Sequence, residues 1–137
     1  MSLLKPGLKT PFHIDFEWWQ KNERDWQVFL RSLLCPEHQE LFADVEGGQV
    51  VDWIDENTAE VRPVQGLQHA LMTHCARLPE FVNEHTSLVE GVFRTFLANG
   101  NSPLSVEGLA ERLKRPAGTI LRTLAGPRVY RGLRPRL

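Results

Sequence analysis

The sequence predicts a mostly helical protein with one small β-hairpin, and three observations lead to this fold class. Apolar residues recur at helical spacing in several segments, most clearly at 88–98. One stretch, QVVDWIDENTAEVRPV, instead has two runs of strand-forming residues around a DENT turn. The chain has 137 residues, of which 42% are hydrophobic and 24% charged, as expected for a globular domain or a core domain with a small appendage.

In the N-terminal half, an arm with proline and glycine precedes a helix predicted over residues 16–34. Its apolar positions recur at spacings of three, four and seven: Trp19, Trp26, Phe29, Leu30 and Leu33. Pro36 cannot continue this helix but can open the next one, so PEHQELFAD is expected to be a short helix with Cys35 at the corner. The hairpin follows, and then a helix over about 67–77.

The C-terminal part is predicted to contain three helices and one strand. Ser87-Leu-Val-Glu90 has the form of a capping box, and Asn99-Gly100 that of a helix end, so a helix is expected between them. Two short helices over about 105–114 and 116–125 follow, and then a strand at 129–133.

The chain is therefore expected to have two parts: residues 1–85, helical with a hairpin, and residues 86–137, a tri-helical unit. No apolar run approaches the roughly 20 residues that cross a bilayer, and the N-terminus lacks the apolar core of a signal peptide. We expect a cytoplasmic protein with no membrane partner, in which cysteines are more often free or metal-bound than joined.

Two Cys/His pairs predict a metal site. Cys35 and His38 have the Cys-x-x-His spacing, the shortest at which two side chains clasp one zinc ion. His74 and Cys75 lie near the apolar stripe of the helix predicted over 67–77, whereas His69 is about 140° from His74 on the same wheel. Two sulfurs and two imidazoles suit zinc better than calcium or magnesium. Four protein ligands leave no open position, so the predicted zinc is structural.

Other interpretations of these residues stay open at this stage. Buried cysteines and core histidines need no metal, and a Cys35–Cys75 disulfide is a further alternative. Cys35 could also be a nucleophile with His38 as its base, but no third orienting residue, oxyanion-hole motif or glycine-rich phosphate loop accompanies them. We therefore do not expect an enzyme.

Four segments resemble a family of short, uncharacterised bacterial proteins and together span nearly the whole chain: DFEWWQKNERDWQVFLRSLLCPEH, VDWIDENTAEV, HALMTHCA and VFRTFLANGNSPLSVEGLAERL. In that family's pattern, cysteines are expected where this chain has His38 and His74. Histidine in place of a thiolate preserves ligation, so the resemblance favours zinc. The order of Cys-x-x-His, hairpin and helix is also similar to that of treble-clef zinc sites, although their last two ligands come from the first turn of the helix.

The segment LSVEGLAERLKRPAGTILRTLAG resembles the helix-turn-helix of winged-helix proteins. Two apolar stripes flank a tight Lys114-Arg115 turn, and Pro116 is expected at the first position of the second helix. The helix at 88–98 would complete a tri-helical core, and VYRGLRP would be the first wing strand. The resemblance implies a DNA-binding protein of transcription-regulator type.

The charge distribution favours an anionic partner for this part. Residues 103–137 hold eight basic and two acidic side chains, a balance of +6, whereas residues 1–102 have a balance of −7. Contacts with double-stranded DNA are expected from Lys114, Arg115, Thr119, Arg122, Arg128 and Arg131, with Arg134 as a further phosphate contact. On the second helix only Arg122 can reach a base edge with two hydrogen bonds. A protein–protein interaction module, or a homodimer joining basic and acidic regions, is therefore the alternative.

Overall fold

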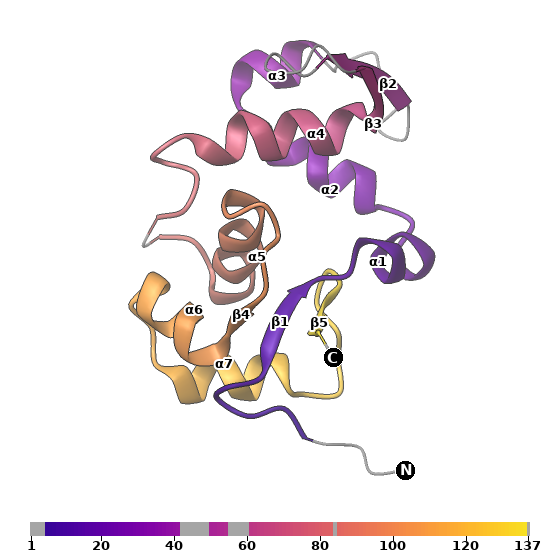
Figure 1. Cartoon of the computed structure of the whole chain (residues 1–137). Helices are drawn as coiled ribbons and strands as arrows, with labels where there is room; N and C mark the ends of the chain where they lie inside the picture. Colours follow the sequence, from indigo (N-terminus) through magenta and orange to yellow (C-terminus); the bar gives the residue numbers. More distant parts are fainter. Residues whose placement is uncertain (1–4, 42–49, 55–60, 84, 137) are drawn as a thin grey trace. The chain divides into compact units, whose positions relative to one another are not determined.

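The computed structural model describes residues 5–41, 50–54, 61–83 and 85–136, and within them the chain is mostly helical, as Figure 1 shows. The chain divides into two compact units: unit 1 consists of Met1–Glu23 and Pro79–Leu137, and unit 2 of Arg24–Leu78. The expected division into residues 1–85 and 86–137 differs from this one, because the N-terminal segment folds with the C-terminal part. None of the described helices is both long and apolar enough to cross a bilayer.

Three of the helices of unit 1 follow the sequence closely: α5 (Leu88–Ala98), α6 (Val106–Leu113) and α7 (Ala117–Leu124). The prediction of a helix at 88–98 is confirmed. It is held by a fully buried apolar face, made of Val92, Phe93, Phe96 and Leu97. The predicted capping box is wrong. The Ser87 side chain makes no cap hydrogen bond, and the Glu90 carboxylate instead forms an ion pair with Arg94 at 2.8 Å.

The end of α5 is built as expected, with glycine in a left-handed conformation. Gly100 has a φ of +75°, and the N–H of Asn101 donates to the carbonyl of Phe96 at 2.7 Å. The N–H of Gly100 donates to the carbonyl of Leu97 at 3.4 Å, which completes a Schellman motif.

The N-terminal arm contains a strand that the sequence analysis did not predict. β1 (Pro11–Ile14) lies between β4 (Leu104–Ser105) and β5 (Leu133–Pro135) in an antiparallel sheet of order β4-β1-β5. Phe12 pairs with Leu104 on one side and with Pro135 on the other. The side chains of Phe12 and Ile14 are 0% and 1% exposed, so β1 contributes to the core of unit 1 as well as to its sheet.

The amide of Asn101 extends the pairing of β1. The N–H of Ile14 donates to Asn101 Oδ1 at 2.8 Å, and Asn101 Nδ2 donates to the Ile14 carbonyl at 2.9 Å. Asn101 itself has a φ of +62°, a left-handed conformation that asparagine adopts more readily than most residues. One side chain thus satisfies both backbone groups of a strand residue, as a further strand would.

The strand predicted at 129–133 lies later in the chain, at Leu133–Pro135. Arg131 and Gly132 have φ values of +49° and +75°, so the backbone turns there and cannot be extended until Leu133. The N–H of Asp15 donates to the Gly132 carbonyl at 2.7 Å, which places the turn against the end of β1.

The single helix predicted over residues 16–34 is wrong, since two helices occupy this segment. α1 (Phe16–Asn22) belongs to unit 1 and α2 (Trp26–Ser32) to unit 2. Glu23 is extended, with φ −130° and ψ 119°, and its carboxylate accepts a hydrogen bond from the Trp19 indole at 2.8 Å. The apolar residues keep a helical spacing across the break between α1 and α2. Each helix buries a tryptophan in its own unit: Trp19 in unit 1 and Trp26 in unit 2.

Unit 2 contains the other expected elements: α3 (Pro36–Leu41), β2 (Val50–Ile54), β3 (Val61–Gln65), α4 (Gly66–Thr73) and the 3₁₀ turn η1 (Cys75–Arg77). The hairpin is confirmed, with β2 and β3 antiparallel and Asp52 opposite Pro63, while its DENT turn lies outside the described residues. The helix predicted over 67–77 ends at Thr73, because His74 leaves helical geometry at φ −125° and ψ −67°.

A pair of glycine-to-alanine substitutions tests this description of unit 1. A Cβ at Gly132 would lie 2.8 Å from the Asp15 carbonyl oxygen at a φ of +75°, so Gly132→Ala should lower the free energy of unfolding by about 1–3 kcal/mol. Within 4 Å, a Cβ at Gly91 in α5 would meet only Leu113 Cδ2, at 3.5 Å. Gly91→Ala should therefore raise the free energy of unfolding by about 0.5–1 kcal/mol. Urea unfolding of both variants measures the two values, and equal effects would contradict the turn at Gly132.

Candidate metal centre and basic surface

The first half of the metal centre lies at the start of α3. Cys35 directly precedes Pro36, and its carbonyl accepts a hydrogen bond from the Gln39 N–H at 2.8 Å, so Cys35 lies at the corner before α3, as expected. His38 is one turn further on, and its Nδ1 lies 3.2 Å from Cys35 Sγ. Both side chains are half-buried.

The second half lies where α4 ends. The rings of His38 and His74 have their centroids 4.4 Å apart, at an angle of 44°. Cys75 is 1% exposed, and its thiol donates a hydrogen bond to Cys35 Sγ at 3.3 Å. His74 and Cys75 are adjacent in sequence but differ in environment, because His74 is exposed.

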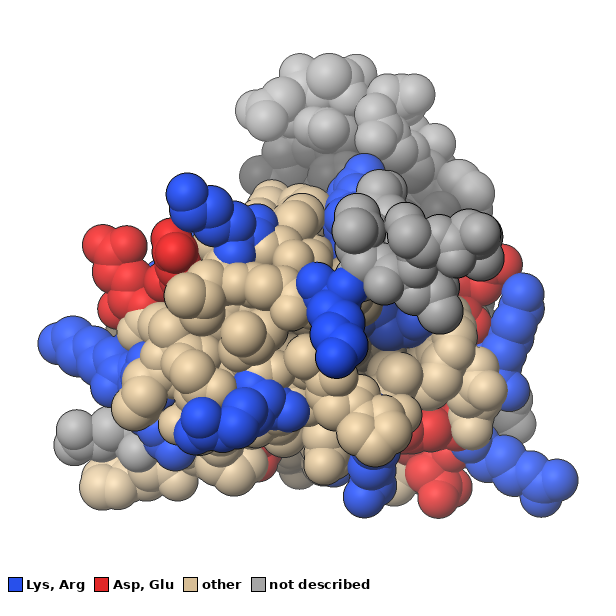
Figure 2. Space-filling view, turned by 90° about the horizontal axis from the view of Figure 1, so that it is seen from below, with Lys and Arg blue, Asp and Glu red and all other residues tan. Residues whose placement is uncertain are grey.

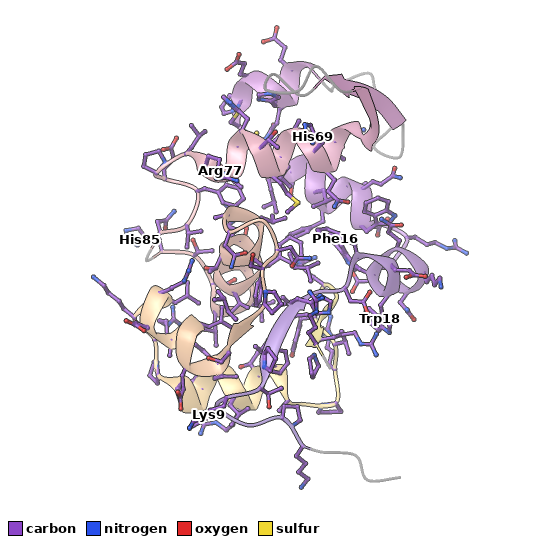
Figure 3. The ribbon with its side chains drawn as sticks, in the orientation of Figure 1. Lys9, Phe16, Trp18, His69, Arg77 and His85 are labelled. Carbon is purple, nitrogen blue, oxygen red and sulfur yellow. The ribbon has the colours of Figure 1, made fainter. Side chains whose placement is uncertain are left out.

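Cys35, His38 and His74 lie close enough together to hold a metal ion, since one ligand atom of each lies within 4.8 Å of the others. Cys75 touches Cys35 but is not part of this group. His69, labelled on α4 in Figure 3, is outside the group, as expected from its position on the helical wheel. Three of the four predicted ligands therefore come together.

Two of the distances in this cluster can be compared with those between the ligands of a tetrahedral zinc site. Bond lengths of about 2.3 Å to sulfur and 2.0–2.1 Å to nitrogen put two tetrahedral sulfur ligands about 3.8 Å apart, and a sulfur and a nitrogen about 3.6 Å apart. The Cys35–Cys75 and Cys35–His38 distances of 3.3 Å and 3.2 Å are within about half an ångström of those values. Small side-chain movements would accommodate an ion at these two pairs.

The protonation of Cys75 sets a condition on metal binding. Burial raises the pKa of the Cys75 thiol to about 11, so this group is a thiol at neutral pH. Because zinc binds the thiolate, ligation by Cys75 would release this proton, and the affinity for metal would rise with pH.

The basic residues predicted to bind nucleic acid all lie in unit 1. Lys114 ends α6 in a left-handed conformation, with a φ of +55°, and the N–H of Arg115 donates to the Ala110 carbonyl at 3.3 Å. Both side chains are exposed, and neither makes an ion pair with any residue that the structure describes. Pro116 is the N-cap of α7, one position before the expected one.

The other predicted contact residues have local partners. On α7 the Arg122 guanidinium donates to Thr119 Oγ1 at 3.4 Å, and the Arg128 guanidinium lies 5.0 Å from the centre of the Tyr130 ring. Arg131 lies at the left-handed turn before β5. Figure 2, a view from below Figure 1, shows lysine and arginine side chains separated by uncharged surface rather than in one continuous patch.

Arg134 has a structural role that the sequence did not indicate. Its guanidinium forms an ion pair with Asp15 at 2.9 Å and lies 5.6 Å from the centre of the Trp18 ring. Asp15 is 119 positions away in the chain, so no local pattern could connect the two. The Asp15 carboxylate thus offsets one of the charges in the C-terminal excess.

Comparisons of this chain with protein-family profiles, with curated proteins and with solved structures find no match. The resemblance to the bacterial family stays a prediction.

Proposed function

We propose that this protein binds double-stranded DNA through unit 1, as a transcription-regulator-like protein with a winged-helix-like unit, and that a structural zinc ion stabilises unit 2. The observation that carries the proposal is the turn between α6 and α7, which presents two exposed cations without ion-pair partners in the described part of the chain, Lys114 and Arg115. Exposed cations beside a helix-turn-helix can neutralise backbone phosphates without reading sequence.

The helices and strands of unit 1 support the winged-helix part of the proposal. α5, β4, α6, α7 and β5 follow one another in the order expected of such a unit. One strand of the usual two-stranded wing is missing after α7 in the described residues, and β1 pairs with β5 instead. The N-terminal arm would thus supply the second strand of the wing.

Few side chains of α7 can contact base edges, so phosphate contacts would be the main source of affinity for DNA. Arg122 is exposed, and the hydrogen bond that its side chain makes among the described residues, to Thr119, is long at 3.4 Å, so the guanidinium can turn toward a base edge. One such arginine contributes about 1–3 kcal/mol of discrimination, whereas phosphate neutralisation acts on every sequence. The proposed binding is therefore weakly specific.

A protein partner is the second candidate function. The separated cations in Figure 2 favour it, since a continuous basic stripe is the more common footprint of a DNA-binding face. A second copy of the chain, with its acidic N-terminal region, would be one such partner.

Zinc is the metal that the donor set fits best, with Cys75 as the fourth ligand. Its sulfur is already in contact with that of Cys35, and loss of one proton makes it a thiolate. Two sulfurs and two imidazoles close a tetrahedral site, which leaves no position for substrate. We therefore propose no catalytic role for the metal centre.

The zinc proposal predicts about one zinc per chain in protein purified without chelator. His74→Asn should lower both the metal content and the Tm, because binding energy in such a site is folding energy. His69→Asn, on the same helix but outside the group, is the matched control and should keep its zinc. Metal analysis and thermal unfolding test both variants, and metal-free protein of unchanged Tm would refute the site.

Cys75→Ser distinguishes a four-ligand site from a three-ligand one. The four-ligand site predicts a large loss of zinc from this variant. Full retention would mean that Cys35, His38 and His74 suffice and leave an open position, contrary to a closed structural site.

The DNA proposal predicts saturable binding of a short duplex at about 50 mM salt, with an affinity that falls steeply as salt rises. Replacing Lys114 and Arg115 with glutamine should weaken binding to all sequences alike and reduce the salt slope by about two. Arg122→Gln should instead reduce any sequence preference. Arg24→Gln, an exposed arginine in unit 2, is the control, and fluorescence anisotropy measures all four proteins. A flat titration at low salt would leave the protein partner as the remaining candidate.

A further inference from the structure

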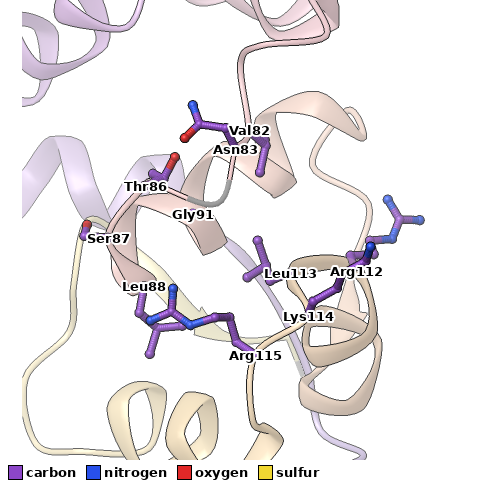
Figure 4. Close-up of a pocket in the computed structure, with 10 residues that line it drawn as sticks. All are labelled: Val82, Asn83, Thr86, Ser87, Leu88, Gly91, Arg112, Leu113, Lys114 and Arg115. Carbon is purple, nitrogen blue, oxygen red and sulfur yellow. The ribbon is translucent and has the colours of Figure 1, made fainter.

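Unit 1 contains a pocket of about 530 Å³, and two of the residues that line it, Lys114 and Arg115, are also proposed DNA contacts. Figure 4 shows it between the segment that leads into α5 and the end of α6. Pockets of roughly 300–1,000 Å³ are those in which proteins enclose small molecules. Its volume is therefore suited to a small ligand rather than to a duplex.

Three of the lining side chains are cations: Arg112, Lys114 and Arg115. All three are exposed, and none makes an ion pair with a described residue. Among the described residues that line the pocket, none is acidic. Glu90, the nearby acid in the first turn of α5, is paired with Arg94 at 2.8 Å. The wall at the end of α6 thus carries positive charge that the described residues do not neutralise.

The opposite wall offers hydrogen-bond donors at the start of α5. The first hydrogen bond of this helix runs from the Gly91 N–H to the Ser87 carbonyl, so the N–H groups of the three preceding residues have no partner within the helix. The Ser87 side chain does not cap them, and the hydroxyl of Thr86 lines the same wall. In Figure 4 the Arg115 side chain extends toward Leu88, so a cation and the positive end of a helix dipole face the same space.

The lining also includes apolar side chains. Val82, Leu88 and Leu113 line the pocket, and in Figure 4 Leu113 points into it from α6. A bare inorganic anion would leave these groups against water, whereas an organic ligand would cover them. The pocket thus combines an anion-binding wall with an apolar surface.

We propose that this pocket binds a small phosphate monoester. The phosphate would lie between Arg115 and the start of α5, with its organic part against Val82 and Leu113. A dianionic phosphate matches the charge of the cationic wall and accepts hydrogen bonds both from a guanidinium and from backbone N–H groups. The site does not depend on the binding of DNA by unit 1.

The test is a titration of the full-length protein with phenyl phosphate at constant ionic strength, followed by ¹H–¹⁵N NMR. The amide signals of Leu88, Val89 and Glu90 should shift saturably. Inorganic phosphate, which lacks the apolar part, should bind more weakly, and phenol, which lacks the anion, should leave these amides unshifted. Arg115→Gln should weaken phenyl phosphate about tenfold or more, as expected for the loss of a charge-assisted hydrogen bond.

Arg136→Gln is the matched control, because Arg136 is an exposed arginine of unit 1 that does not line the pocket. The Arg136→Gln variant should bind phenyl phosphate with the same affinity as the unmodified protein. Absence of saturable shifts at the start of α5, or equal weakening in the two variants, would overturn the proposal. So would a short DNA duplex that shifts these amides when phenyl phosphate does not, since the cations would then serve the DNA backbone.

Discussion

Unit 1 depends on the pairing of β1 with two strands from the far end of the chain. A strand in the middle of a sheet has polar backbone groups on both edges, and each needs a partner once water is excluded. β4, β5 and the Asn101 amide supply those partners, while Phe12 and Ile14 fill the core below. β1 is therefore part of the same folded unit as α5, α6 and α7.

This arrangement has consequences for both proposed binding surfaces. β1 pairs with β4, which directly precedes α6, and with β5, which follows α7 after residues 125–132. It thus joins the two ends of the segment that contains the basic turn. The pairing of Arg134 with Asp15 then adds charge complementarity at the end of β1. In unit 2, side-chain contacts join the start of α3 to the end of α4. They are made by Cys35, His38, His74 and Cys75. A metal at such a point would stabilise the contact between the start of α3 and the end of α4.

The parts of the structure that could be predicted are those that local sequence determines. The helix at 88–98 has its apolar stripe and its end signal within its own residues, and the hairpin at 50–65 has its strand formers close together. β1 could not be recognised because PFHI is short and its partners lie about 90 and 120 positions later. The break between α1 and α2 was missed because an unbroken apolar spacing hides a boundary between two units.

The Cys/His cluster that could hold a metal was predicted in part for the same reason. Cys-x-x-His is a local signal, and Cys35 and His38 adopt the expected arrangement. His74 and Cys75 were placed by a helical wheel, which fails where the helix stops at Thr73. The turn at His74 leaves that side chain exposed and buries Cys75, so the two adjacent residues meet Cys35 in different ways.

The central claim is that β1 is an integral strand of unit 1, and native-state amide hydrogen exchange tests it most directly. The amides to follow are those of Ile14 and Asp15, which donate to Asn101 and Gly132, with those of Phe93 and Phe96 in α5 as the reference. If β1 is integral, Ile14 and Asp15 exchange only through the same opening as α5 and with a similar free energy. Exchange of these two amides at the rate of an unfolded chain, while α5 stays protected, would contradict the account.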